Sequence, residues 1–147
     1  MTVLLVDAAN VVGARPDGWW RDRAGATARL LARLAALPGR EVGGAVVSGV
    51  VVSGVVVSGV VVSAVVVVVE GAARDVPAPD GVRLVRAAGS GDDALVATAG
   101  ELAAAGRDLL VVTADRGLRA RLPAGTAVTG PGRLLDVLDR MAGNGPG

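Results

Sequence analysis

Four apolar runs along this 147-residue chain each lead to acidic side chains. Each run has at least four residues and is rich in Val or Leu, which is typical of strands buried on both faces. Helical patterns alternate with these runs, so we expect a single α/β domain with a doubly wound, mostly parallel sheet. Ligands bind at the carboxyl ends of the strands in such sheets. Asp7, Glu70 and Asp115 fall at such ends, and Asp92 and Asp93 open an expected helix just after the run at 82–85.

The expected elements alternate along most of the chain. Strands are predicted over 3–6, 65–69, 82–85, 109–113 and 126–129, and helices over 22–37, over 92–105, after Asp115 and from Gly130 onward. Gly13, Pro16 and Gly18 predict a loop after the first strand. We therefore expect one domain over residues 1–141, followed by a disordered tail over 142–147.

A tandem repeat interrupts this pattern. Residues 46–65 contain Val-Val-Ser-Gly-Val three times and then Val-Val-Ser-Ala-Val. A period of five matches neither a strand nor a helix, so we interpret residues 46–64 as an insert and 65–69 as the true second strand. The Ser-Gly pairs favour short hairpins or a flexible loop. Deleting whole units is expected to leave the fold intact.

A membrane span over residues 45–69 is the competing interpretation, because about 20 uncharged apolar residues suffice to cross a bilayer. The segment is rich in Val with interspersed Ser and Gly, has no flanking aromatic belt, and has Arg on both sides. A span would also separate Asp7 from Asp92 and Asp115. We therefore expect no membrane partner.

The composition excludes many kinds of active site. The chain has no His, Cys, Lys or Tyr, which removes Ser-His-Asp and Cys-His nucleophiles, a catalytic lysine and any His/Cys zinc site. Clustered carboxylates without such partners are suited to a hard cation, Mg²⁺ or Mn²⁺. Residues 1–40 carry six Arg and three Asp, a basic excess that suits a polyanion. The absence of Cys gives no indication of secretion, and we expect a cytoplasmic protein.

Each motif also has a purely structural interpretation. Asp7 and Asp115 can be turn or helix-capping residues. Ser90 and Asp93 have the spacing of a capping box, which accounts for Asp93 better than for Asp92. The loose dinucleotide pattern over 89–94 is rejected, because two carboxylates in that turn would repel a pyrophosphate.

Two further groups of side chains have open roles. Trp19 and Trp20 are the only aromatic residues, and each is a candidate either to stack on a base or to pack on the protein. Arg116, Arg119 and Arg121 follow Asp115 and either contact phosphates or form a charged helix face.

Taken together, the motifs resemble the NYN/PIN-like nuclease superfamily over roughly residues 2–140, apart from the repeat. The resemblance rests on four segments in order: Asp7-Ala8-Ala9-Asn10-Val11-Val12, Val69-Glu70-Gly71, Asp92-Asp93-Ala94-Leu95-Val96 and Thr113-Ala114-Asp115-Arg116. The resemblance implies a PIN-like Rossmannoid fold and an endoribonuclease that uses Mg²⁺ or Mn²⁺ to activate water.

Carried over to this chain, the resemblance makes Asp7, Asp92, Asp93 and Asp115 the catalytic metal ligands, directly or through water. Glu70 is a fifth expected ligand, although the family more often has Asp at its position. Asn10 is expected to steady the site and, with Thr113 and Arg116, to contact the RNA substrate.

The sequence leaves two alternative functions open: a nucleotide pyrophosphohydrolase or other small-substrate phosphoryl hydrolase, and a non-catalytic RNA-binding module. A homodimer is also open.

Overall fold

The computed structural model of the chain describes residues 2–37, 55–57 and 60–143. Five parallel strands lie in the order β4-β3-β1-β5-β6, and β2 pairs antiparallel with the first part of β3. This arrangement confirms the predicted single α/β domain with a mostly parallel sheet. The strands are β1 (Thr2–Asp7), β2 (Val55–Val57), β3 (Val60–Val69), β4 (Val82–Arg86), β5 (Asp108–Val112) and β6 (Ala127–Thr129).

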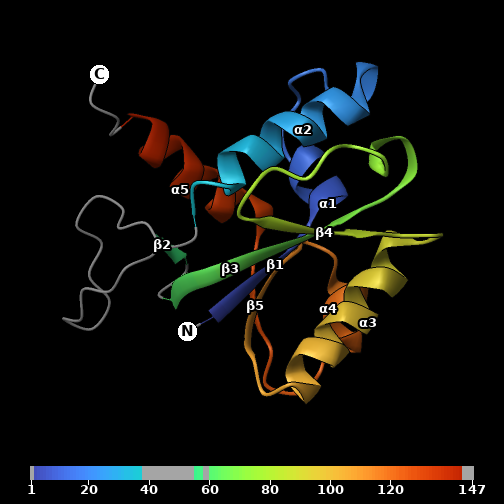
Figure 1. Ribbon diagram of the computed structural model, residues 1–147, viewed down its shortest axis with the longest axis vertical. Coiled ribbons are helices and arrows are strands. Elements are labelled where there is room, and N and C mark those ends of the chain that lie inside the picture. The colour runs from blue at the N-terminus through green and yellow to red at the C-terminus, as the bar shows by residue number, and fades with distance from the viewer. Residues whose placement is uncertain (1, 38–54, 58–59, 144–147) are drawn as a thin grey trace.

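Helices cover both faces of the sheet. Helices α1, α2 and α5 lie on one face, and α3 and α4 lie on the other (Figure 1). The helices are α1 (Ala8–Val12), α2 (Arg23–Leu34), α3 (Gly91–Ala104), α4 (Arg116–Arg121) and α5 (Pro131–Gly143), with short 3-10 turns η1 (Trp19–Arg21) and η2 (Gly71–Ala73).

The central strands alternate between two apolar cores. Leu4 and Val6 of β1 pack with α1, α2 and α5, whereas Leu5 packs on the side of α3. Strand β3 alternates in the same way, with Val67 on the first side and Val68 on the second. Because both faces are covered, these strands are apolar throughout rather than alternately apolar and polar.

Strand β3 begins earlier than the sequence predicted. It starts at Val60 rather than at residue 65, so part of the last repeat copies belongs to the sheet. Val62 is fully buried, and the Ser63 hydroxyl donates a hydrogen bond to the Thr2 carbonyl oxygen over 3.1 Å. The five-residue period obscured this boundary, because every copy looks alike in sequence.

The remainder of the repeat is described only in part. Strands β2 and β3 pair antiparallel, and Ser58-Gly59, which lies between them in the sequence, is outside the described residues. Residues 38–54, which carry the first copies, lie outside the described residues. Among the helices that the structure describes, none is long and apolar enough to cross a membrane.

Helix α1 was not predicted, but Asp7 caps its first turn, which is one of the two structural interpretations of this residue. The loop predicted from Gly13, Pro16 and Gly18 follows this helix. Helix α5 continues to Gly143 and so includes the first two residues of the segment 142–147 for which a disordered tail was predicted. Residues 144–147 lie outside the described part of the chain.

The sheet topology places two chain segments side by side at the carboxyl edge. The chain leaves β1 for β3 on one side, and β5 later pairs with the other side of β1. Val6 lies opposite Val112 in this pairing, so the residues that follow β1 and β5 are neighbours. Such a point, where the strand order reverses, is where doubly wound sheets bind ligands.

Candidate active site

Asp7 is the most buried acid at this edge, with only 5% of the residue exposed. Its carboxylate accepts hydrogen bonds from the Asn10 side-chain nitrogen over 3.0 Å and from the Asn10 backbone nitrogen over 3.4 Å. Burial raises the pKa of Asp7, and the negative charges of Asp92 and Glu70 raise it further, while the Asn10 hydrogen bonds oppose the shift. The buried carboxyl group therefore faces other acids rather than a cation.

Asn10 connects the ends of two strands. Its side-chain nitrogen donates to Asp7, and its side-chain oxygen accepts a hydrogen bond from the Ala114 backbone nitrogen over 3.2 Å. The amide therefore links the end of β1 to the loop after β5. This contact supports the predicted role of Asn10 in steadying the site.

Asp115 lies at the start of α4, where its Oδ1 accepts from the Leu118 nitrogen over 3.1 Å. Thr113 is buried, and its hydroxyl oxygen accepts from the Asp115 nitrogen over 3.1 Å. Thr113 thus shapes the loop that carries Asp115, and this buried position does not favour the expected contact between Thr113 and substrate. Arg116 is exposed beside Asp115.

The adjacent acids Asp92 and Asp93 differ in environment. Asp93 is exposed and forms an ion pair with Arg121 over 2.6 Å, and its backbone nitrogen bonds to the Ser90 hydroxyl as the capping box predicts. Asp92 is half-buried. Desolvation raises its pKa, and so do the charges of Asp115, Glu70 and Asp93, while Arg121 lowers it. The structure thus brings Asp92 into the cluster, whereas the Asp93 carboxylate is already paired.

Glu70 lies against the first residue of α3. Its carboxylate accepts a short hydrogen bond from the Gly91 nitrogen, and a side-chain carbon added to Gly91 would lie 2.6 Å from a Glu70 oxygen. The Glu70 carboxylate therefore lies tightly against Gly91, and a larger residue at this position would displace it. The contact joins residues that are far apart in the sequence, so no local sequence pattern predicts it.

Four acids from different strand ends thus share one electrostatic neighbourhood: Asp7, Glu70, Asp92 and Asp115. Within the described residues, no three of the acids lie close enough to form a metal-binding group by themselves. Mg²⁺ usually keeps several waters and uses only one or two carboxylates, so this oxygen-only set fits a hydrated hard cation better than a dehydrated one. Their mutual repulsion would be relieved by such a cation.

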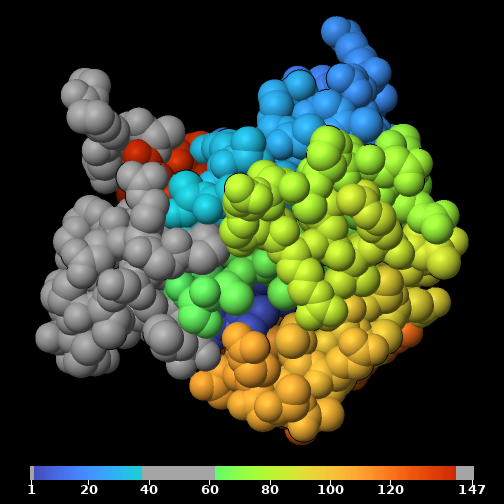
Figure 2. Space-filling model, in the orientation of Figure 1, coloured from blue at the N-terminus to red at the C-terminus, as the bar shows by residue number. Residues whose placement is uncertain are grey.

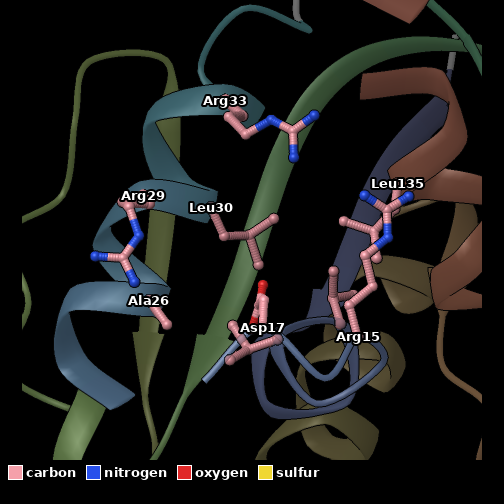
Figure 3. A pocket seen from close by; sticks show the side chains of 9 residues that line it. Arg15, Asp17, Ala26, Arg29, Leu30, Arg33 and Leu135 are labelled. Atoms are coloured by element: carbon pink, nitrogen blue, oxygen red, sulfur yellow. The ribbon is translucent and has the colours of Figure 1, made fainter. Parts of the chain in front are cut away.

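A second polar region lies on the α1–α2–α5 side. Arg15, Arg29 and Arg33 line a pocket of about 210 Å³ there (Figure 3). Arg15 and Arg33 each donate to a different oxygen of Asp139 over 2.7 Å, which ties α5 to α2 and to the segment after α1. These two ion pairs hold the pKa of Asp139 at about 2. The protein's own cations therefore compensate this acid.

The chain matches no family model, and no curated protein is similar to it in sequence. Among solved structures, it is similar to Rae1 (YacP) from Bacillus subtilis, with a TM-score of 0.64 and 18% identity over 97% of this chain and 76% of that chain. A mutant of the same protein gives a TM-score of 0.64 and 19% identity over 97% of this chain and 77% of that chain. At this identity the likeness shows the fold, a parallel sheet flanked by helices in a PIN-like Rossmannoid arrangement.

Proposed function

We propose that this protein is a Mg²⁺- or Mn²⁺-dependent endoribonuclease whose site is the acid cluster at the carboxyl edge of the sheet. One observation carries the proposal: Asp92 lies near acids that follow two other strands, and the charges of these acids, Asp115 and Glu70, raise its pKa. Arg121, whose charge lowers the pKa of Asp92, is already paired with Asp93. The sequence resemblance to NYN/PIN-like nucleases and the fold shared with Rae1 support the same conclusion.

The residues of the cluster have distinct expected roles. Asp7, Asp92 and Asp115 would hold a hydrated cation, at most two of them directly and the rest through water, with Glu70 positioned beside them at the start of α3. When bound, a divalent cation lowers the pKa of a water molecule and offsets charge on the attacked phosphate.

Positioning groups complete the site. The Asn10 side chain donates a hydrogen bond to the Asp7 carboxylate and holds it in place. The burial of Asp7 further limits the orientations that its carboxylate can adopt. Arg116 is exposed next to Asp115, where its guanidinium would contact a substrate phosphate and offset repulsion from the acids. Preorganised charge of this kind is the usual means by which phosphoryl-transfer sites act.

The test is cleavage of a single-stranded oligoribonucleotide with Mn²⁺, with Mg²⁺ and with EDTA. We expect cleavage with either metal, none with EDTA, and none by the Asp115→Asn variant. Asn caps a helix about as well as Asp, so this variant keeps the start of α4 and loses only the charge. Full activity of Asp115→Asn would contradict the proposal.

The same assay separates the other functions. Hydrolysis of nucleoside triphosphates without cleavage of oligoribonucleotides would indicate a small-substrate phosphohydrolase. Binding of RNA that is unaffected by EDTA and gives no products would indicate an RNA-binding module.

A further inference from the structure

A pocket of about 340 Å³ adjoins the acid cluster on the α1–α2 side. Small residues form much of its wall, including Ala8 and Ala9 of α1 and Gly71 and Ala72 of η2. Trp19 of η1 and Arg23, the first residue of α2, also line it. Its volume lies near the lower end of the range for small-molecule sites.

The pocket and the acid cluster share residues. Glu70 lines the pocket and also contacts Gly91, the first residue of α3. Asp92 is the next residue of this helix. Ala8 lines it and directly follows Asp7. The yellow-green residues that follow β3 lie on the surface beside the blue and cyan residues near the start of the chain (Figure 2). A group held in the pocket would therefore lie next to a phosphate at the cluster.

Two side chains that line the pocket are of kinds that stack on flat rings. The Arg23 guanidinium carbon lies 5.3 Å from the centre of the Trp19 ring, a cation–π contact. Indole and guanidinium planes both stack on nucleobases. Thr27 also lines the pocket, and its hydroxyl donates to the Arg23 carbonyl oxygen over 2.8 Å.

The neighbouring Trp20 has a different environment. Its ring meets Trp19 edge-on, with the ring centres 6.0 Å apart, and 52% of the residue is exposed. Trp19 lines the pocket, and Trp20 is not among the residues that form the wall. The pair therefore offers a matched comparison between an aromatic residue at the pocket and one beside it.

We infer that this pocket binds a nucleobase of the RNA next to the cleaved phosphate, with Trp19 and Arg23 as the stacking groups. The inference rests on the proposed ribonuclease function for its biological context. Binding of the base requires neither cation nor cleavage, so it can be tested separately.

The chain has two Trp and no Tyr, so its fluorescence reports directly on this region. The experiment titrates the protein with ribonucleoside 5′-monophosphates in EDTA and records tryptophan emission. Ribose 5-phosphate, which lacks a base, is the control ligand. We expect a saturable change with at least one nucleotide and none with ribose 5-phosphate.

Variants then locate the binding. Trp20→Phe should keep the saturable change, whereas Trp19→Leu should weaken binding roughly ten- to hundredfold, as measured by equilibrium dialysis. Gly89 lines the pocket, and a side-chain carbon added there meets no atom within 4 Å. Gly89→Leu should therefore fill the pocket and weaken binding without disturbing the core, which provides a second variant if Trp19→Leu unfolds.

The outcomes separate the two proposals. The inferred base binding in the pocket would be overturned by an equal fluorescence response to ribose 5-phosphate. It would also be overturned if both Gly89→Leu and folded Trp19→Leu bound nucleotides as tightly as the unmodified protein. Base-dependent binding that both variants lose would support the inferred base-binding pocket. If the unmodified protein binds bases in this way but shows no metal-dependent cleavage, the proposed ribonuclease function would be overturned while the pocket stands.

Discussion

In two regions of this molecule, the surroundings shift the pKa values of carboxyl groups in opposite directions. Asp139 is exposed on α5, and two arginines lower its pKa to about 2. Asp7 and Asp92 lie at the carboxyl edge of the sheet, where burial and neighbouring acids raise their pKa values. The same side chain is thus stabilised as an anion in one place and destabilised in the other.

The difference shows how structural and functional charges can be told apart. A shifted pKa alone does not identify a function, because ion pairs that support the fold also shift pKa values. The direction of the pKa shift and the charge of the neighbouring groups that cause it are more informative. Asp139 has arginine partners within the fold, whereas Asp7 and Asp92 face acids, and this arrangement suits a cation supplied from outside.

The largest expected effect contrasts two adjacent residues. Asp92→Asn should lower Mn²⁺-dependent cleavage by more than about a hundredfold, because even partners behind metal ligands are worth about 10- to 100-fold. Asp93→Asn should retain most activity, since its carboxylate is exposed and paired with Arg121. Initial cleavage rates at saturating Mn²⁺ measure both. Equal losses in the two variants would show that Asp93 is also a ligand.

Removal of the Asn10 amide should have the next largest effect. Asn10→Ala leaves buried Asp7 and the Ala114 nitrogen without these hydrogen bonds, so cleavage should fall about 10- to 100-fold. The free energy of unfolding should fall by about 1–3 kcal/mol, as measured by denaturant titration. Unchanged activity together with lower stability would make Asn10 a purely structural residue.

The pH dependence of stability should distinguish Asp7 from ordinary acids. Its folded pKa is raised, so the folded protein keeps this proton to higher pH than the unfolded chain does. Its contribution to stability is therefore lost as pH rises from 3.8 through the folded pKa. In EDTA, Asp7→Asn should gain stability relative to the unmodified protein over this range. A constant difference across pH would contradict the raised pKa.

Asp139 should give the smallest effect, with the opposite sign. Its pKa is lowered to about 2, so its contribution is present above pH 3.8 and is lost as pH falls toward 2. Asp139→Asn should therefore be slightly less stable at neutral pH, and this deficit should vanish in acid and shrink in salt. Cleavage should be unchanged. A loss of cleavage in a folded Asp139→Asn variant would connect the two regions.

Much of the fold was predictable. The apolar runs of β1 and β5 are typical of strands buried on both faces of a parallel sheet, and the sequence of α3 has a helical pattern. Helix α1 was not predicted, because five residues after a strand carry too little periodicity and Asp7 resembles a turn residue. The start of β3 was misplaced because identical repeat copies give the same local pattern, and only pairing with β1 selects the register.

The candidate site was predictable in its residue types but not in its contacts. Strand ends identified Asp7 and Asp115, since topology alone places these ends together. The contrast between Asp92 and Asp93 depends on side-chain direction, and the contact of Glu70 with α3 depends on packing between distant segments. Neither can be deduced from local sequence.

The central claim is that the acid cluster binds a divalent cation, and the most direct measurement is the thermal unfolding midpoint with and without Mn²⁺. A ligand at 100 times its Kd stabilises the folded state by about 2.7 kcal/mol. We expect Mn²⁺ to raise the midpoint of the unmodified protein and of Asp139→Asn, and to leave that of Asp92→Asn nearly unchanged. An equal Mn²⁺ shift in all three proteins, or none in the unmodified protein at millimolar Mn²⁺, would contradict the account.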